Sequence, residues 1–177
     1  SISTGNASPT LPPLVEVRRG PLVESLYRGV LVVSDAHGRV LAAAGDPDYV
    51  TYMRSSAKPL QAVAMVESGA ADRFGFADEE LAVMTGSHSG SPAHVRAVCR
   101  ALQRLGLDAS ALVCGAHLPL DAESRQAMEA QGQAPTPVHN NCSGKHTGIL
   151  ALSLHRGWPT QGYEQPAHPA QQCIRQT

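Results

Sequence analysis

The sequence predicts an α+β fold in which antiparallel strands come first and helices follow. β-Branched and apolar runs fill residues 14–44, and residues 35–38 have turn chemistry between two of these runs. From residue 59 onward, apolar residues instead recur with helical spacing. Because the two kinds of element are segregated, the order favours an antiparallel sheet packed by helices, with further strands of any closed sheet still to come.

Length and composition favour one domain, or part of one. The 177 residues are enough to bury a sizeable core. Residues 1–13 are rich in Ser, Thr, Gly and Pro, which predicts a disordered tail, so we assign the domain to residues 14–177. With 14 Lys and Arg against 15 Asp and Glu, the chain offers no basic surface for nucleic acid. No run approaches the roughly 20 apolar residues that span a membrane.

The cysteines indicate a reducing compartment. Cys99, Cys114, Cys142 and Cys173 are spread singly, which argues against a disulfide framework. The N-terminal residues also lack the basic start and apolar core of a secretion signal. We therefore expect a cytoplasmic protein with buried thiols, one of which is a candidate metal ligand.

Three runs predict the strands. They cover residues 14–18, 23–33 and 39–44, and the turn at 35–38 joins the last two. We expect two or three antiparallel strands.

Two helices are predicted in the middle of the chain. The first covers residues 59–67, where apolar residues have helical spacing, and Gly69 follows as its C-terminal cap. The second begins with Ser91 as N-cap and Pro92 in the first turn, and its buried stripe continues until Gly106.

Two more helices are predicted near the C-terminus, over residues 121–131 and 144–156. The latter has so little polar surface that we expect it at the centre of the core. Residues 171–177 have neither a helix stop signal nor a polar tail, so we expect the sequence to end within an element.

The first candidate site is residues 54–59, which read Arg-Ser-Ser-Ala-Lys-Pro. Ser55 and Lys58 are three positions apart, so one helical turn places the hydroxyl and the amine on the same face. A desolvated lysine acts as a base toward a serine hydroxyl, because burial removes the hydration of its charged form. Pro59 suits only the start of a helix, which places Ser55 near an N-terminus that favours negative charge. The alternative, commoner for a lone S-x-x-K, is an N-cap serine beside a solvated lysine.

The second candidate site is residues 85–92, which read Thr-Gly-Ser-His-Ser-Gly-Ser-Pro. Small and hydroxyl residues around one histidine, just before a helix, are suited to supply a second hydroxyl and backbone donors for an oxyanion. The alternative is a flexible loop that only caps the helix.

The third candidate site is residues 139–148, which read His-Asn-Asn-Cys-Ser-Gly-Lys-His-Thr-Gly. Two amides, a thiol, a lysine and two imidazoles in ten residues are hard to explain by packing, because each needs a buried partner. The segment is not a phosphate loop, since the G-x-x-x-x-G-K pattern requires a glycine where His139 stands. The alternative is a polar network that fixes the start of the helix.

With these segments in view, the chain resembles the asparaginase II family. This is the rhizobial-type, class 3 L-asparaginase, which uses a serine nucleophile and is unrelated to the threonine-nucleophile bacterial asparaginases. The resemblance runs from about Leu14 to the end. The resemblance rests on six matches in the same order, which together are far more specific than any single motif. They cover residues 15–20, 54–62, 67–72, 87–90, 114–117 and 140–148.

The resemblance implies hydrolysis of L-asparagine to L-aspartate and ammonia by a homodimer. It also implies a fold similar to serine β-lactamases and glutaminases, an αβα sandwich that is incomplete here. Family members are longer than this sequence, so the chain corresponds to their N-terminal half. We therefore expect a complementary C-terminal half or a partner chain to supply the rest, and residues 1–177 alone to be inactive.

Carried over by position, the resemblance implies that Ser55 is the nucleophile and Lys58 its base. Ser87 belongs to a second serine–lysine pair. Cys142 and Lys145 match two ligands of a zinc site, which requires the lysine to bind as a free amine.

The resemblance also implies that Arg54 lies on the substrate side and that His146 lies beside the metal. We assign His88 and Asn141 to substrate binding together with these two residues. The sequence departs from the family at Ser91, where a glutamate is usual, which removes a carboxylate near the site and leaves an N-cap.

Two further departures concern residues that this sequence lacks. The second cysteine ligand and the lysine of the second pair would both lie after residue 177. Cys173 does not match that cysteine.

Two other functions remain open. A β-lactamase or penicillin-binding relative shares S-x-x-K but needs S-D-N and K-T-G elements. Residues 87–89, Ser-His-Ser, match the S-D-N element poorly. Residues 145–148, Lys-His-Thr-Gly, differ from the K-T-G element by an inserted histidine. A non-catalytic zinc-binding or assembly half is the third reading.

Overall fold

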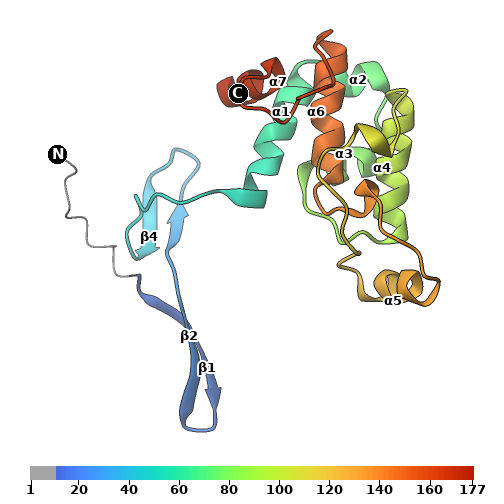
Figure 1. Cartoon of the computed structure of the whole chain (residues 1–177). Helices are drawn as coiled ribbons and strands as arrows, with labels where there is room; N and C mark the ends of the chain where they lie inside the picture. The colour runs from blue at the N-terminus through green and yellow to red at the C-terminus, as the bar shows by residue number, and fades with distance from the viewer. Residues whose placement is uncertain (1–10) are drawn as a thin grey trace, which may run out of the picture. The chain divides into compact units, whose positions relative to one another are not determined.

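The computed structural model describes residues 11–177, so most of the predicted N-terminal tail lies outside the described residues. The chain divides into two compact units, Ser1–Tyr52 and Met53–Thr177, and each is described by itself (Figure 1). Within residues 11–177 there are seven α-helices and two small antiparallel sheets. The fold class is therefore α+β, as the sequence predicted.

The first unit consists of two hairpins. Strand β1 (Pro13–Arg19) pairs with β2 (Leu22–Arg28), and β3 (Leu31–Ser34) pairs with β4 (Val40–Ala44). The prediction of two or three strands was wrong, because the apolar run 23–33 is interrupted at Gly29, whose N–H bonds to the carbonyl oxygen of Pro12. A continuous apolar run does not show where a chain changes its pairing partner.

The turn predicted at residues 35–38 is confirmed. Asp35 Oδ1 accepts hydrogen bonds from the backbone N–H groups of His37 and Arg39, and Gly38 takes a positive φ of 78° that glycine adopts without strain.

The hairpins expose most of their apolar side chains. The exposed large residues of the four strands are Leu14, Val15, Val17, Leu22, Val23, Leu26, Tyr27, Leu31, Val32, Val33, Val40 and Leu41.

The second unit is helical. Its elements are η1 (Arg54–Ala57), α1 (Lys58–Glu67), α2 (Ala70–Phe74), α3 (Asp78–Thr85), α4 (Pro92–Arg104), η2 (Ala109–Ala111), α5 (Ala122–Ala130), η3 (Pro137–His139), α6 (Ser143–His155) and α7 (Pro169–Gln176). The four predicted helices match α1, α4, α5 and α6 to within two residues at each end. Gly69 follows α1 with a φ of 85°, as expected of a terminal glycine.

Helices α2, α3 and α7 were not predicted, because all three are short. The start of α3 nevertheless carries a signal, since three acidic residues fill its first turn. One of them, Glu80, accepts the backbone N–H of Ala77 at 2.8 Å. The same carboxylate is fully buried and pairs with Arg104 of α4 at 2.9 Å, so it ties the two helices together.

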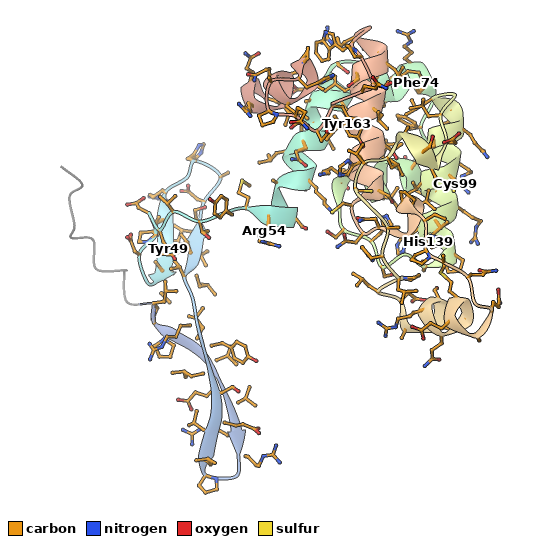
Figure 2. All side chains as sticks on the ribbon, in the orientation of Figure 1. Tyr49, Arg54, Phe74, Cys99, His139 and Tyr163 are labelled. Carbon is orange, nitrogen blue, oxygen red and sulfur yellow. The ribbon has the colours of Figure 1, made fainter. Side chains whose placement is uncertain are left out.

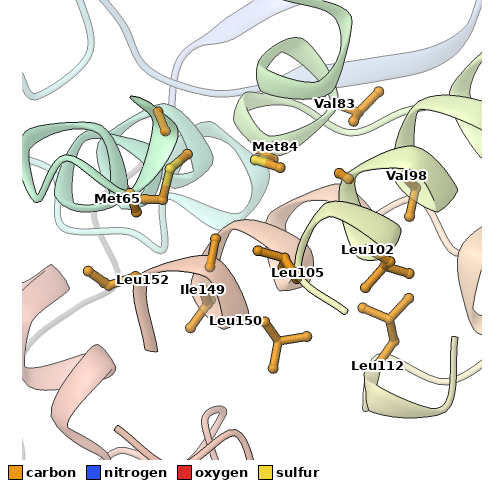
Figure 3. Close-up of a cluster of buried hydrophobic side chains, with 14 of the residues drawn as sticks. Met65, Val83, Met84, Val98, Leu102, Leu105, Leu112, Ile149, Leu150 and Leu152 are labelled. Atoms are coloured by element: carbon orange, nitrogen blue, oxygen red, sulfur yellow. The ribbon is translucent and has the colours of Figure 1, made fainter. Parts of the chain in front are cut away.

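Helix α6 lies at the centre of the core, as the sequence predicted. It packs against α1, α2, α3, α4 and α7. Its side chains Ile149, Leu150 and Leu152 are buried in one cluster with Met65 of α1 and Met84 of α3 (Figure 3).

One glycine sets the spacing between α6 and α3. A Cβ atom at Gly144 would lie 1.9 Å from the backbone oxygen of Val83, which is far inside contact distance. Because Val83 lies just before the segment that carries Ser87, this close approach also brings the start of α6 to the candidate site.

Candidate active site

The candidate site is centred on Lys58, the first residue of α1. Its side chain is only 3% exposed. The ammonium nitrogen Nζ lies 2.7 Å from Ser87 Oγ, 3.2 Å from the carbonyl oxygen of Asn141 and 3.4 Å from that of Gly86. The three segments that the sequence singled out therefore meet at this one nitrogen.

This environment suits both protonation states of the amine. Carbonyl oxygens only accept hydrogen bonds, so a neutral Lys58 donates its two hydrogens to Asn141 and Gly86 and offers its lone pair to the Ser87 hydroxyl. A charged Lys58 donates to all three groups. The contact between Lys58 Nζ and Ser87 Oγ is therefore compatible with either direction of hydrogen bonding.

Ser55 lies in η1, the single helical turn that leads into α1, and it is exposed. This position just before the helix agrees with the prediction from Pro59. The backbone N–H of Lys58 donates to the carbonyl oxygen of Ser55, but among the described residues no hydrogen bond joins the two side chains.

Arg54, beside Ser55, has an unusual backbone. Its φ of 49° is the only positive value at a non-glycine residue within residues 11–177. This left-handed conformation costs free energy for a side chain with a Cβ, and such residues cluster at functional sites. The exposed Arg54 marks the entry to α1 in Figure 2.

His88 joins the Ser87 segment to the start of α6. Its Nδ1 accepts the backbone N–H of Gly90 at 3.2 Å, so the proton is on Nε2, which donates to Ser143 Oγ at 2.8 Å. The Ser143 hydroxyl in turn donates to the carbonyl oxygen of Val138. Both ring nitrogens of His88, a predicted substrate ligand, are thus engaged within the chain.

Burial, together with smaller effects of the nearby charges of His94 and Lys58, lowers the pKa of His88 to about 4. The ring is therefore neutral at physiological pH, in agreement with its hydrogen bonds.

His146 is also held within the chain. Its Nδ1 lies 2.8 Å from the hydroxyl of Tyr163, which accepts the backbone N–H of Val113 at 3.1 Å. Burial lowers the pKa of His146 to about 4, with smaller contributions from the charges of Lys145 and Lys58.

The predicted zinc ligands lie at the start of α6, where Cys142 is the N-cap residue. Burial lowers the pKa of the half-buried Lys145 amine, whereas the charge of Cys142 raises it. Burial raises the pKa of the Cys114 thiol, and the charges of Cys142 and Lys145 also act on it in opposite directions, so a second sulfur lies in their vicinity. Two thiols and an amine that loses its proton more easily are donors suited to zinc. Within residues 11–177, no three His, Cys, Asp or Glu side chains are grouped so as to hold a metal ion.

A groove of about 480 Å³ opens beside Ser87, between α3 and α4. Its lining includes the charged side chains of Glu79, Arg96 and Arg100 as well as Ser87 and His88. A pocket of this size accommodates a small molecule, and charges of both signs suit a zwitterion.

The structure thus brings together Lys58, Ser87 and Asn141 of the predicted residues. The sequence analysis missed two side chains that hold this group, His117 and Asn140. The available signal was their place in the matched segments 114–117 and 140–148, to which no role had been given.

The family model described as L-asparaginase II matches residues 15–177. No individually curated protein matches the chain. In the part of the chain that the structure describes, every helix is too short or too polar to cross a membrane.

Proposed function

Because this chain belongs to the L-asparaginase II family, we propose that it serves in the hydrolysis of L-asparagine to L-aspartate and ammonia by a serine–lysine mechanism. The observation that supports the mechanism is the buried Lys58 amine at 2.7 Å from Ser87 Oγ, one helical turn after Ser55. A buried lysine amine can act as the base for a serine nucleophile, and a second serine bonded to the amine can carry the proton to the leaving group.

In the proposed acylation, Ser55 Oγ attacks the side-chain amide carbon of asparagine and gives its proton to Lys58 Nζ. Ser87, hydrogen-bonded to Lys58, passes a proton to the amide nitrogen, which leaves as ammonia when the C–N bond breaks. Lys58 then returns its proton to Ser87, so both groups regain their starting states.

In the proposed deacylation, water attacks the aspartyl ester on Ser55. The water gives one proton to Lys58, which returns it to the departing Ser55 oxygen, and aspartate is released. The groove beside Ser87 supplies charges of both signs for the α-ammonium and α-carboxylate groups of the substrate. Arg54, on the turn beside Ser55, is a further candidate for the carboxylate, and the carboxamide of Asn141 for the substrate amide.

Zinc, if bound, would be held by Cys142 and Lys145 and would supply Lewis-acid polarisation or a fixed geometry at the start of α6. His146 lies beside these two residues in the sequence, and its neutral ring would remain available near the metal.

The experiment is to measure ammonia release from asparagine with Lys58→Met, using the intact protein. Loss of the base should lower kcat by about 100-fold or more, since a positioned proton acceptor contributes 10²- to 10⁴-fold. A kcat within about threefold of the wild-type value would show that Lys58 is not the base.

A further inference from the structure

The nearer of the two carbonyl groups that Lys58 contacts, that of Asn141, belongs to a peptide group whose N–H is also held by a hydrogen bond. The Asn141 carbonyl oxygen lies 3.2 Å from Lys58 Nζ. In the same peptide, the N–H of Cys142 donates to Asn140 Oδ1 at 2.8 Å. Because a peptide group is planar, fixing this N–H fixes the direction of the carbonyl that faces Lys58.

The side chain of Asn140 has no freedom to turn. Its Nδ2 donates to the carbonyl oxygens of Cys114 at 2.8 Å and Gly115 at 3.2 Å. With two acceptors on the nitrogen side and an N–H donor on the oxygen side, only one orientation of the amide satisfies all three bonds. The side chain is 8% exposed, so water does not compete for them.

The side chain of His117 holds the backbone N–H of Asn141. The ring nitrogen Nδ1 lies 2.7 Å from the carbonyl oxygen of Leu118, which only accepts, so Nδ1 carries the proton. Nε2 is then the acceptor for the Asn141 N–H at 3.1 Å. Both clamping side chains are thus anchored on the segment 114–118.

We propose that Asn140 and His117 are positioning residues of the serine–lysine site, which act on Lys58 through the carbonyl group of Asn141. This inference rests on the proposed function. The other carbonyl acceptor of Lys58, that of Gly86, is more distant at 3.4 Å, so the direction of the amine toward Ser87 depends on Asn141. A displacement of about 1 Å at a reacting group costs on the order of 10²-fold in rate.

The test compares Asn140→Ala and His117→Ala with Gln171→Ala. Gln171 is a matched control, because its side-chain amide also holds a backbone carbonyl, that of Tyr163 at 2.8 Å, but has no bond to the Lys58 group. Each variant is measured for melting temperature, for kcat and KM with asparagine, and for the ¹⁵N signal of Lys58 Nζ. His117→Gln supplies a side-chain acceptor again and should recover part of any loss.

We expect both positioning variants to lose at least about tenfold in kcat with KM within about threefold, and to shift the Lys58 signal. Gln171→Ala should lower only the melting temperature. Unchanged kcat in both positioning variants, or losses equal to that of the control, would overturn the proposal. If the intact wild-type protein releases no ammonia from asparagine, the proposed function fails, whereas an unmoved Lys58 signal in both variants overturns the positioning role whatever the activity.

Discussion

Lys58 Nζ is hydrogen-bonded to Ser87 Oγ, although the two residues are 29 positions apart and the S-x-x-K motif pairs Lys58 with Ser55. Lys58 is therefore related to two serines, to Ser55 by sequence spacing and to Ser87 by direct contact. This arrangement fits a division of labour in which one hydroxyl attacks and the other moves a proton.

Ser87→Ala tests that division of labour. Removal of the hydroxyl leaves the groove almost unchanged, so KM should remain within about threefold while kcat falls by about 100-fold, the range for a lost proton-transfer group. Steady-state kinetics with asparagine measure both constants. A large rise in KM with kcat unchanged would instead make Ser87 a residue that only binds substrate.

Gly144→Ala should disrupt the second unit. The new Cβ would overlap the backbone oxygen of Val83, which cannot move without shifting α3, and we expect a loss on the order of 3 kcal/mol in the free energy of unfolding. Gly148→Ala, one turn later in α6, is the matched control, because its Cβ would lie 3.5 Å from the side chain of Met84. This control should be neutral or gain up to about 1 kcal/mol from helix propensity. Equal stabilities in denaturant unfolding would contradict the close packing of α6 on α3.

His88 should make the fold sensitive to acid. Its pKa is about 4 in the folded chain, below the ordinary value of 6.5, so the folded state favours the neutral ring. The contribution to stability is complete above pH 6.5 and is lost as pH falls from 6.5 through 4, by roughly 3 kcal/mol over that window.

The check is denaturant unfolding of wild type and His88→Gln between pH 7 and pH 4. Glutamine cannot take up this proton, so the stability of the variant should fall less steeply with acid. His146 titrates in the same direction in both proteins, so their difference isolates His88. Parallel curves would show that His88 is not the group responsible.

Cys142→Ala should lose zinc from the intact protein. Thiolate and amine ligands must be deprotonated, so zinc binding to wild type should also weaken in acid. Metal analysis of purified protein checks both effects, with Cys99→Ala of α4 as the matched half-buried thiol. Stoichiometric zinc in Cys142→Ala would show that the metal, if present, is held elsewhere.

Much of the helical unit could be predicted from the sequence, because its long helices have clear apolar stripes and end signals. The central position of α6 followed from the apolar run Ile149, Leu150, Leu152 and Leu154, of which Leu154 is only partly buried. The contact between Lys58 and Ser87 could not be predicted, because local spacing describes one helical turn and says nothing about which loop packs against it. The structural use of His88 was missed for a similar reason, since its bond to Ser143 joins residues 55 positions apart.

The measurement that tests the central claim most directly is the identification of the serine that becomes acylated. The intact protein is treated with an electrophilic asparagine analogue, and the modified peptide is located by mass spectrometry in wild type and in Ser55→Ala, Ser56→Ala and Ser87→Ala. The account predicts a label on Ser55 in wild type, in the control Ser56→Ala and, more slowly, in Ser87→Ala, and no label in Ser55→Ala. A label on Ser87 that persists in Ser55→Ala, together with near-normal ammonia release, would contradict the assignment of Ser55 as the nucleophile.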